Sequence, residues 1–237
     1  MTRKHTKLFF VFLSCYLVLF RGKTKTTTMN IKVCGITEMK QLQQLDGLDI
    51  DFAGLIFYKE SPRYIGEKIS KKELKSADFD LKKVGVFVNP EMINVLDAID
   101  DYGLDAVQLH GDETPEMCDD LSSEVEVIKV FRITGDEDID KLVAPYDAVC
   151  DYYLFDTGGL KESFGGTGKQ FDWTILTKAK IEKPFFLSGG IGPDDALKVK
   201  AFTHPDFFGV DINSLFEKEP GVKDMGKVLH FRQGLKK

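Results

Sequence analysis

Short apolar runs alternate with segments of helical period along most of this chain, and the alternation restricts the fold more than any other feature. Eight runs rich in β-branched and aromatic residues recur at intervals of about 20 to 30 residues. They cover residues 31–36, 52–57, 84–88, 106–110, 127–133, 153–157, 185–190 and 207–213. Helical patterns lie between them, the clearest at 38–46, 90–103, 114–123 and 193–202. Strands that are apolar at nearly every position are typical of a parallel sheet covered on both faces.

Eight such units in about 205 residues predict an α/β protein with a single (β/α)8 TIM barrel, at the small end of the size range of that fold. A doubly wound open sheet is the alternative. That fold favours a Gly-rich G-x-G-x-x-G turn after its first strand, and this chain has IKVCGIT there instead, at residues 31–37. Since no linker-like segment divides the rest, we expect one barrel domain over residues 29–237.

Residues 1–28 differ from the remainder of the chain. They carry six Lys/Arg and no acidic residue, placed around the apolar run LFFVFLSCYLVLF. This run is shorter than the roughly 20 residues that a membrane span needs, and no small-x-small cleavage site follows it. We therefore expect residues 1–28 to be an extension outside the fold, with Met29 as the working start. A signal or anchor function and a structured role are the alternatives.

The barrel portion is acidic. Without residues 1–28 the chain has 26 Lys/Arg against 38 Asp/Glu, a formal charge of −12. Because contacts to nucleic-acid phosphates need clustered cations, we expect no nucleic-acid partner, and no membrane partner for the barrel. An anionic ligand would have to be held by backbone amides and a few placed cations.

The four cysteines form no CxxC pair and have no metal-ligand spacing with the four histidines. They are Cys15, Cys34, Cys118 and Cys150. We therefore expect reduced thiols, a cytoplasmic location and no bound metal.

Polar side chains stand at the expected carboxyl ends of all eight strands, which is the end where TIM barrels place their active sites. In chain order they are Cys34, Arg63, Asn89, Gln108 and His110, Arg132, Asp156, Ser188, and then Asp211, Asn213 and Ser214. A cysteine at the end of a strand and before a glycine is a candidate for chemistry. The alternative is an ordinary core thiol.

The last two strand ends predict a phosphate site. The loops after strands seven and eight commonly bind phosphate in this fold. Gly189 and Gly190 in LSGGIGP leave backbone amides uncovered, and Asn213 and Ser214 in GVDINS add further donors. Glycines that merely form turns are the alternative explanation.

Several segments together resemble one family, the phosphoribosylanthranilate isomerases of tryptophan biosynthesis. The resemblance runs from Met29 to the C-terminus, and its motifs occur in the family's order. They are IKVCGIT, GLIFYKESPRYI, KVGVFVN, VQLHG, LFDT followed by GGTGKQFDW, LSGGI, and GVDINS with EKEPGVKD. Each segment is only suggestive alone, whereas all of them in register make a specific match.

The resemblance implies an Amadori rearrangement of N-(5-phosphoribosyl)anthranilate to 1-(2-carboxyphenylamino)-1-deoxyribulose 5-phosphate. An acid protonates the ring oxygen to give an iminium ion, and a base then removes the proton from C2. No cofactor is implied, because the nitrogen of the substrate is the electron sink. Cys34 matches the general base of the family and Asp156 its general acid. A thiol suits a base at neutral pH where a cation or local dipoles favour the thiolate.

Three further residues match positions that the family uses for its substrate. Arg63 matches the arginine near the anthranilate carboxylate, for which a planar guanidinium is well shaped; a salt bridge is the alternative. Asp211 matches a position near the sugar and amine, with a structural role as its alternative. His110 is either a binding residue or an ordinary strand-end histidine. Monomers and homodimers both fit the family.

The run GGTGK at residues 165–169 resembles half of a phosphate-binding P-loop, but Lys169 is followed by Gln170 instead of Ser or Thr. The resemblance implies a flexible cover after strand six, which we expect to become ordered on ligand binding.

Two other functions fit parts of the pattern. One is the related histidine-pathway isomerase, whose base on the first strand is an aspartate and whose barrel has two phosphate sites. The other is a non-catalytic barrel that senses a phosphate ligand. Cys34 argues against the first, and the presence of both Cys34 and Asp156 argues against the second.

Overall fold

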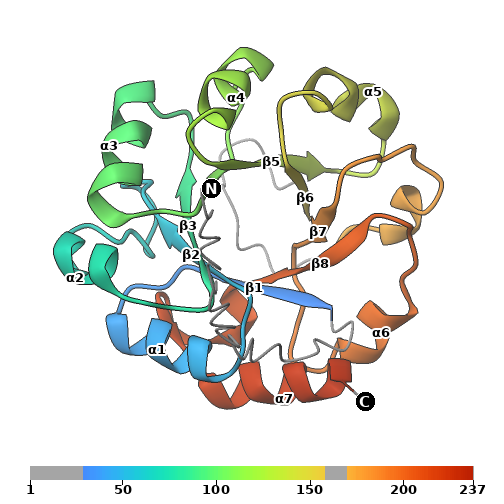
Figure 1. Ribbon diagram of the computed structural model, residues 1–237. Coiled ribbons are helices and arrows are strands. Elements are labelled where there is room, and N and C mark those ends of the chain that lie inside the picture. The colour runs from blue at the N-terminus through green and yellow to red at the C-terminus, as the bar shows by residue number, and fades with distance from the viewer. Residues whose placement is uncertain (1–28, 158–169, 237) are drawn as a thin grey trace, which may run out of the picture.

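The computed structural model describes residues 29–157 and 170–236, in which eight parallel strands close into a barrel in the order of the chain (Figure 1). The strands are β1 Asn30–Cys34, β2 Phe52–Ile56, β3 Lys82–Phe87, β4 Ala106–Leu109, β5 Glu126–Ile133, β6 Tyr152–Thr157, β7 Phe185–Leu187 and β8 Phe207–Ile212. The predicted TIM barrel is confirmed. The predicted extension over residues 1–28 and the predicted cover with its GGTGK run at residues 165–169 lie outside the described residues.

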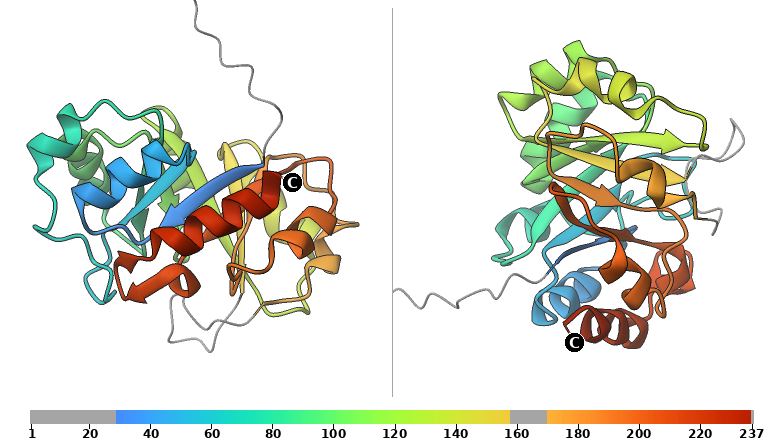
Figure 2. Two further views of the ribbon diagram at one scale, coloured as in Figure 1. Left: turned by 90° about the horizontal axis from the view of Figure 1, so that it is seen from below. Right: turned by 90° about the vertical axis from the view of Figure 1, so that its right-hand side faces the viewer.

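Helices form an outer ring around the barrel (Figure 1). They are α1 Met39–Gly47, α2 Lys71–Ser76, α3 Met92–Tyr102, α4 Pro115–Ser122, α5 Ile139–Val143, α6 Ala196–Ala201 and α7 Met225–Lys236. The last helix, α7, lies between α1 and α6 and so completes the ring (Figures 1 and 2). Across residues 29–157 and 170–236 we find no helix with the length and apolar character of a membrane span.

Short elements fill the remaining connections. The 3-10 helix η1 Ala144–Tyr146 follows α5, and η2 Trp173–Leu176 precedes β7 in the position of an outer helix. After β8 come η3 Ser214–Phe216 and a small antiparallel pair, β9 Glu217–Glu219 and β10 Val222–Lys223. This pair follows β8 and η3 in the chain, at the end of the barrel where β8 finishes.

The turn after β7 departs from the sequence prediction. We expected a strand over 185–190 and a helix over 193–202, whereas β7 ends at Leu187 and α6 begins at Ala196. Gly189 and Gly190 have φ values of 84° and 65°, which extended strands exclude. A side chain at Gly189 would also overlap Thr157 Oγ1 on the neighbouring strand end. The turn therefore needs glycine for both its backbone conformation and its packing.

Strand residues alternate between two cores, as the period of two requires. Ile31 and Val33 of β1 pack outward beneath the helices. The barrel interior is filled by Phe52, Val84, Ala106, Ile128, Val130, Leu154 and Phe186. Cys34 packs with Ile56 and Val86 in a separate cluster. All three line the cavity described below, so this cluster forms its apolar floor.

Glu113 holds the loops after β3 and β4 against β5. Its carboxylate accepts hydrogen bonds from the backbone N–H groups of Asn89 (2.9 Å) and Gly111 (3.0 Å). It also forms a buried ion pair of 2.7 Å with Lys129 Nζ. Because Gly111 directly follows His110, this node fixes the end of β4 from which His110 projects.

We expect Glu113→Ala to lower the free energy of unfolding by about 3–5 kcal/mol, because it leaves the Lys129 ammonium buried and unpaired. Denaturant unfolding measures this loss for Glu113→Ala and for a control variant, Asp112→Ala. The ion pair of Asp112 with Arg132 is exposed, so its loss should cost about 0–1 kcal/mol. Equal losses in the two variants would contradict the role of the node.

Candidate active site

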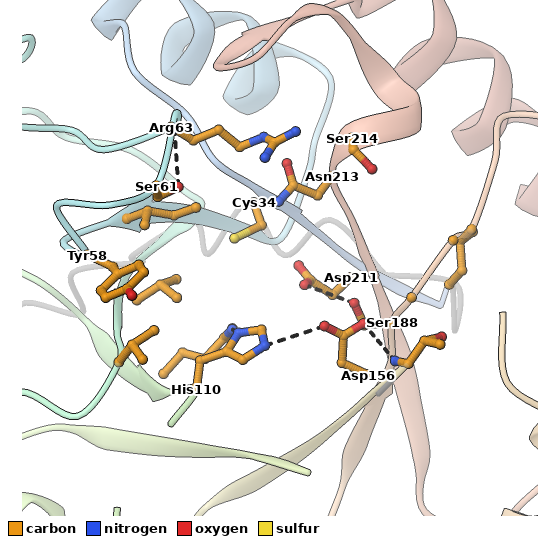
Figure 3. A pocket seen from close by; sticks show the side chains of 18 residues that line it. Cys34, Tyr58, Ser61, Arg63, His110, Asp156, Ser188, Asp211, Asn213 and Ser214 are labelled. Atoms are coloured by element: carbon orange, nitrogen blue, oxygen red, sulfur yellow. Dashed lines mark hydrogen bonds and ion pairs between the residues drawn. The ribbon is translucent and has the colours of Figure 1, made fainter. Parts of the chain in front are cut away.

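A cavity opens at the carboxyl ends of the strands. All of the site residues predicted from the sequence lie on its lining (Figure 3). These are Cys34, Arg63, His110, Asp156, Gly189, Gly190, Asp211, Asn213 and Ser214. Residues up to 180 positions apart in the chain therefore converge on one space, as the barrel predicts.

Cys34 ends β1 with its side chain toward the cavity and 4% of its surface exposed. It pairs in register with Gly54 of β2, whose carbonyl accepts hydrogen bonds from the N–H groups of both Gly35 and Ile36. A methyl group at Gly54 would lie 2.8 Å from Cys34 Sγ. The absence of a side chain at Gly54 thus makes the room that the sulfur occupies.

The thiol lies beside a buried ion pair. Lys32 precedes Cys34 by two residues, and its Nζ donates a 2.8 Å hydrogen bond to Oδ1 of Asp211 on β8. Burial raises the pKa of Cys34, and the nearby ammonium groups of Lys32 and Lys223 oppose that rise. Burial likewise raises the pKa of Asp211, against the effect of Lys32. A cation or local dipoles near the thiol were expected from the sequence, but these two lysines were not identified from it.

Asp156 reaches the cavity from β6 and is 8% exposed. Its Oδ1 accepts a 2.9 Å hydrogen bond from the N–H of Thr157, and its Oδ2 lies 3.4 Å from Nε2 of His110 (Figure 3). Nδ1 of His110 lies 3.2 Å from Nε2 of Gln108. Gln108, His110 and Asp156 therefore form a polar row along one wall of the cavity.

Gln108 is a further candidate that the sequence analysis placed at a strand end without giving it a role. It is almost fully buried, and its Oε1 has no hydrogen-bond partner within the described part of the chain. An unpaired buried oxygen costs free energy, so its place on the cavity lining suits a ligand that donates to it. The sequence did contain a signal for this role: Gln108 comes two residues before His110, which places both side chains on the same face of the strand end.

Arg63 is held by an acidic residue from beyond the barrel strands. Nε and Nη2 donate to the carboxylate of Glu217 at 2.9 and 2.7 Å, and Glu217 also accepts from Nζ of Lys223 at 2.7 Å. Burial alone would raise the pKa of Glu217, but the hydrogen bonds from Arg63 and Lys223 hold it below its usual value. Nη1 takes no part in this clamp.

The two predicted phosphate loops line the same cavity. Gly189 and Gly190 are on its lining together with Asn213 and Ser214, and the last two lie near each other in Figure 3. Oδ1 of Asn213 accepts a 2.6 Å hydrogen bond from Lys223 Nζ, which turns the amide NH₂ of Asn213 away from that lysine.

Within residues 29–157 and 170–236 no three His, Cys, Asp or Glu side chains gather as a metal site would require.

A family model described as N-(5'-phosphoribosyl)anthranilate (PRA) isomerase matches residues 31–234. An isomerase with that name from Parabacteroides distasonis is 43% identical over 207 residues, which are 86% of this chain and 92% of the relative. The chain belongs to the N-(5'-phosphoribosyl)anthranilate isomerase family. It is an isomerase of tryptophan biosynthesis whose reaction is the Amadori rearrangement of this family. This membership decides against the histidine-pathway isomerase and the non-catalytic sensor.

Solved structures support the same membership. The phosphoribosyl anthranilate isomerase of Thermotoga maritima superposes with a TM-score of 0.77 at 30% identity, covering 88% of this chain and 98% of its own. A family structure in complex with the reduced product analogue, reduced 1-(o-carboxyphenylamino)-1-deoxyribulose 5-phosphate, gives a TM-score of 0.74 over the same shares. Another solved structure is of monomers generated from the dimeric isomerase of Thermotoga maritima, with a TM-score of 0.74 at 30% identity.

We expect Gly54→Ala to lower the isomerase kcat by about 10- to 100-fold, because the added methyl group displaces the Cys34 sulfur. The crowding should cost about 1–3 kcal/mol of stability. Steady-state kinetics and denaturant unfolding measure the two effects separately. Gly47→Ala is the matched control, since a methyl group there meets nothing within 4 Å. A Gly54→Ala enzyme with unchanged kcat would show that the sulfur position is not critical.

Proposed function

We propose that this cavity binds N-(5-phosphoribosyl)anthranilate and that Cys34 and Asp156 rearrange it as general base and general acid. The observation that carries the proposal is the arrival of a buried thiol from β1 and a buried carboxyl group from β6 in the same cavity (Figure 3). Two groups on different sides of the barrel can act on different atoms of one sugar.

In the first step, protonated Asp156 gives its proton to the ring oxygen of the substrate. The bond from C1 to the ring oxygen breaks, and the nitrogen lone pair forms a C1=N iminium bond. Because Thr157 N–H already occupies Oδ1, the oxygen that carries the proton is Oδ2, beside His110 Nε2. His110 thus orients the acid.

In the second step, the Cys34 thiolate removes the proton from C2. The C–H electron pair forms a C1=C2 bond, the iminium electrons return to nitrogen, and the resulting enolamine tautomerises to the ketone. Burial raises the pKa of the thiol and so moves formation of the thiolate to higher pH. The rate of this step should therefore increase as the pH rises.

The other contacts orient the substrate. The amides of Gly189 and Gly190, with Asn213 and Ser214, suit its phosphate. Nη1 of Arg63 suits the anthranilate carboxylate, and the Glu217 clamp holds the guanidinium in place for it. Asp211 and His110 face the space between these two ends, where the sugar would lie.

We propose further that the enzyme acts in the cytoplasm, as a monomer or homodimer, and does not bind nucleic acid. The formal charge of −12 outside residues 1–28 supports the last point, since it disfavours contacts with phosphate backbones.

Cys34→Ala and Asp156→Asn should each lower kcat by about 10²- to 10⁴-fold, the usual contribution of general acid–base catalysis. The loss of substrate fluorescence during turnover measures the rate. Cys118→Ala removes a buried thiol on α4, outside the cavity lining, and should leave kcat unchanged. Full activity in either of the first two variants would remove the assigned role.

Arg63→Lys should raise KM about tenfold with a smaller effect on kcat, because a single ammonium group cannot contact Glu217 and a carboxylate in the bidentate geometry of guanidinium. N-(5-phosphoribosyl)aniline, which lacks the carboxylate, is the matched substrate. The substitution should affect its KM little. Equal increases for both substrates would argue against a contact between Arg63 and the carboxylate.

A further inference from the structure

Lys32 is a buried cation that the proposed mechanism does not use. Its side chain has no exposed surface, and it lies on the interior face of β1, two residues before Cys34. The register of β1 with β8 sets Lys32 directly opposite Asp211, to which it donates its 2.8 Å hydrogen bond. The lysine therefore lies next to an aspartate and a thiol that both line the cavity.

A lysine in this place requires an explanation beyond fold stability. Burying an ion pair costs several kcal/mol for each ion, and apolar replacements of similar volume are often neutral or stabilising. The neighbouring interior positions of the barrel are apolar, as in Phe52 and Val84. The position of Lys32 next to the proposed base thus points to a chemical role.

Cys34 is surrounded by charged and titratable groups from several elements. They are Lys32 on its own strand, Asp211 on β8, Lys223 on β10, Arg63 after β2, His110 after β4 and Asp156 on β6. Lys223 is already bound by Glu217 and Asn213, and Arg63 by Glu217. Lys32 differs from both, because its single ion-pair partner within the described residues, Asp211, faces the thiol as well.

We propose that Lys32 is a positioning residue for the catalytic base, whose ammonium group is shared between Asp211 and the Cys34 sulfur and compensates the charge of the thiolate. The inference rests on the proposed role of Cys34. Without Lys32, ionisation of Cys34 would place two anions side by side in a buried site. With Lys32, the three groups carry a net charge of −1 when the thiolate forms, and the cation lies against both anions.

The electrostatic directions agree with this arrangement. Burial would lower the pKa of Lys32, yet the negative charges of Asp211 and Cys34 raise it above its ordinary value. The two neighbouring negative charges thus favour the protonated form of Lys32 despite its burial. In the other direction, Lys32 lowers the pKa of Cys34 while Asp211 raises it. Removing the cation and removing the anion should consequently shift the thiol in opposite directions.

The test measures the pH dependence of Cys34 alkylation by iodoacetamide, which follows the thiolate fraction. Mass spectrometry of the peptide that contains Cys34 separates it from the other cysteines. Lys32→Met should move the midpoint upward by about one to three pH units. Asp211→Asn should move it downward, and Lys32→Met/Asp211→Asn should lie between the two single variants. The pH profile of kcat/KM in Lys32→Met should shift in the same direction as the thiol.

An unchanged midpoint in folded Lys32→Met would overturn the proposal and leave Lys32 a purely structural role. If Lys32→Met does not fold, because Asp211 is left buried without a partner, the decisive pair is the double variant against Asp211→Asn. The double variant buries no unpaired charge, and its midpoint should be the higher of the two. Equal midpoints in that pair would also overturn the proposal.

Failure of the proposed function gives a different result. If Cys34 is not the base, Cys34→Ala retains its kcat whatever the thiol midpoints are. If Cys34 is the base but Lys32 does not act on it, Cys34→Ala is inactive and the alkylation midpoints of the lysine variants do not move.

Discussion

The pairing of β1 with β8 closes the barrel, and the site depends on its register. Lys32 and Asp211 are 179 residues apart in the chain, yet this pairing sets them opposite each other at 2.8 Å. The pairing of β1 with β2 then places Cys34 against Gly54, the position without a side chain. A shift of one residue would turn Lys32 and Cys34 outward into the helix layer and bring Val33 inward. The apolar pattern of β1 prevents that shift, because Ile31 and Val33 must be buried beneath the helices.

Local sequence patterns were sufficient to predict the barrel and most of the cavity lining. Each apolar run became a strand, and the carboxyl ends of parallel strands necessarily meet at one end of the barrel. Cys34, Asp156 and Asp211 could therefore be assigned to one site before any distance was known. The boundaries were less accurate where polar residues belong to a strand. β3 begins at Lys82 instead of residue 84, because Lys82 pairs with Phe52 of β2 along the backbone, whereas an apolar pattern leaves out a charged residue.

The supporting residues could not be predicted because their roles arise only from tertiary contacts. Lys32 reads as a polar interruption in an apolar strand until Asp211 is placed beside it. Glu217 and Lys223 lie in a charged segment that resembles an exposed turn, and their burial follows from contact with Arg63 and Asn213. These three residues have partners far away in the chain or on short elements without periodicity. The site residues predicted from the sequence, in contrast, stand at or just after strand ends, and the barrel fold brings those ends together.

The charges around the cavity are divided in a way that suits the proposed reaction. Arg63, Glu217 and Lys223 together carry a net charge of +1, the sign that the proposed contact with a substrate carboxylate requires. Under the proposed mechanism, Lys32, Asp211 and Asp156 together carry −1 once Asp156 has given up its proton. The substrate nitrogen is at that stage a cationic iminium ion in the same cavity as this negative group. Fixed charges of opposite sign stabilise such an ion without reorganisation. The same negative charge would oppose formation of the thiolate at Cys34, and this is the charge that we propose Lys32 compensates.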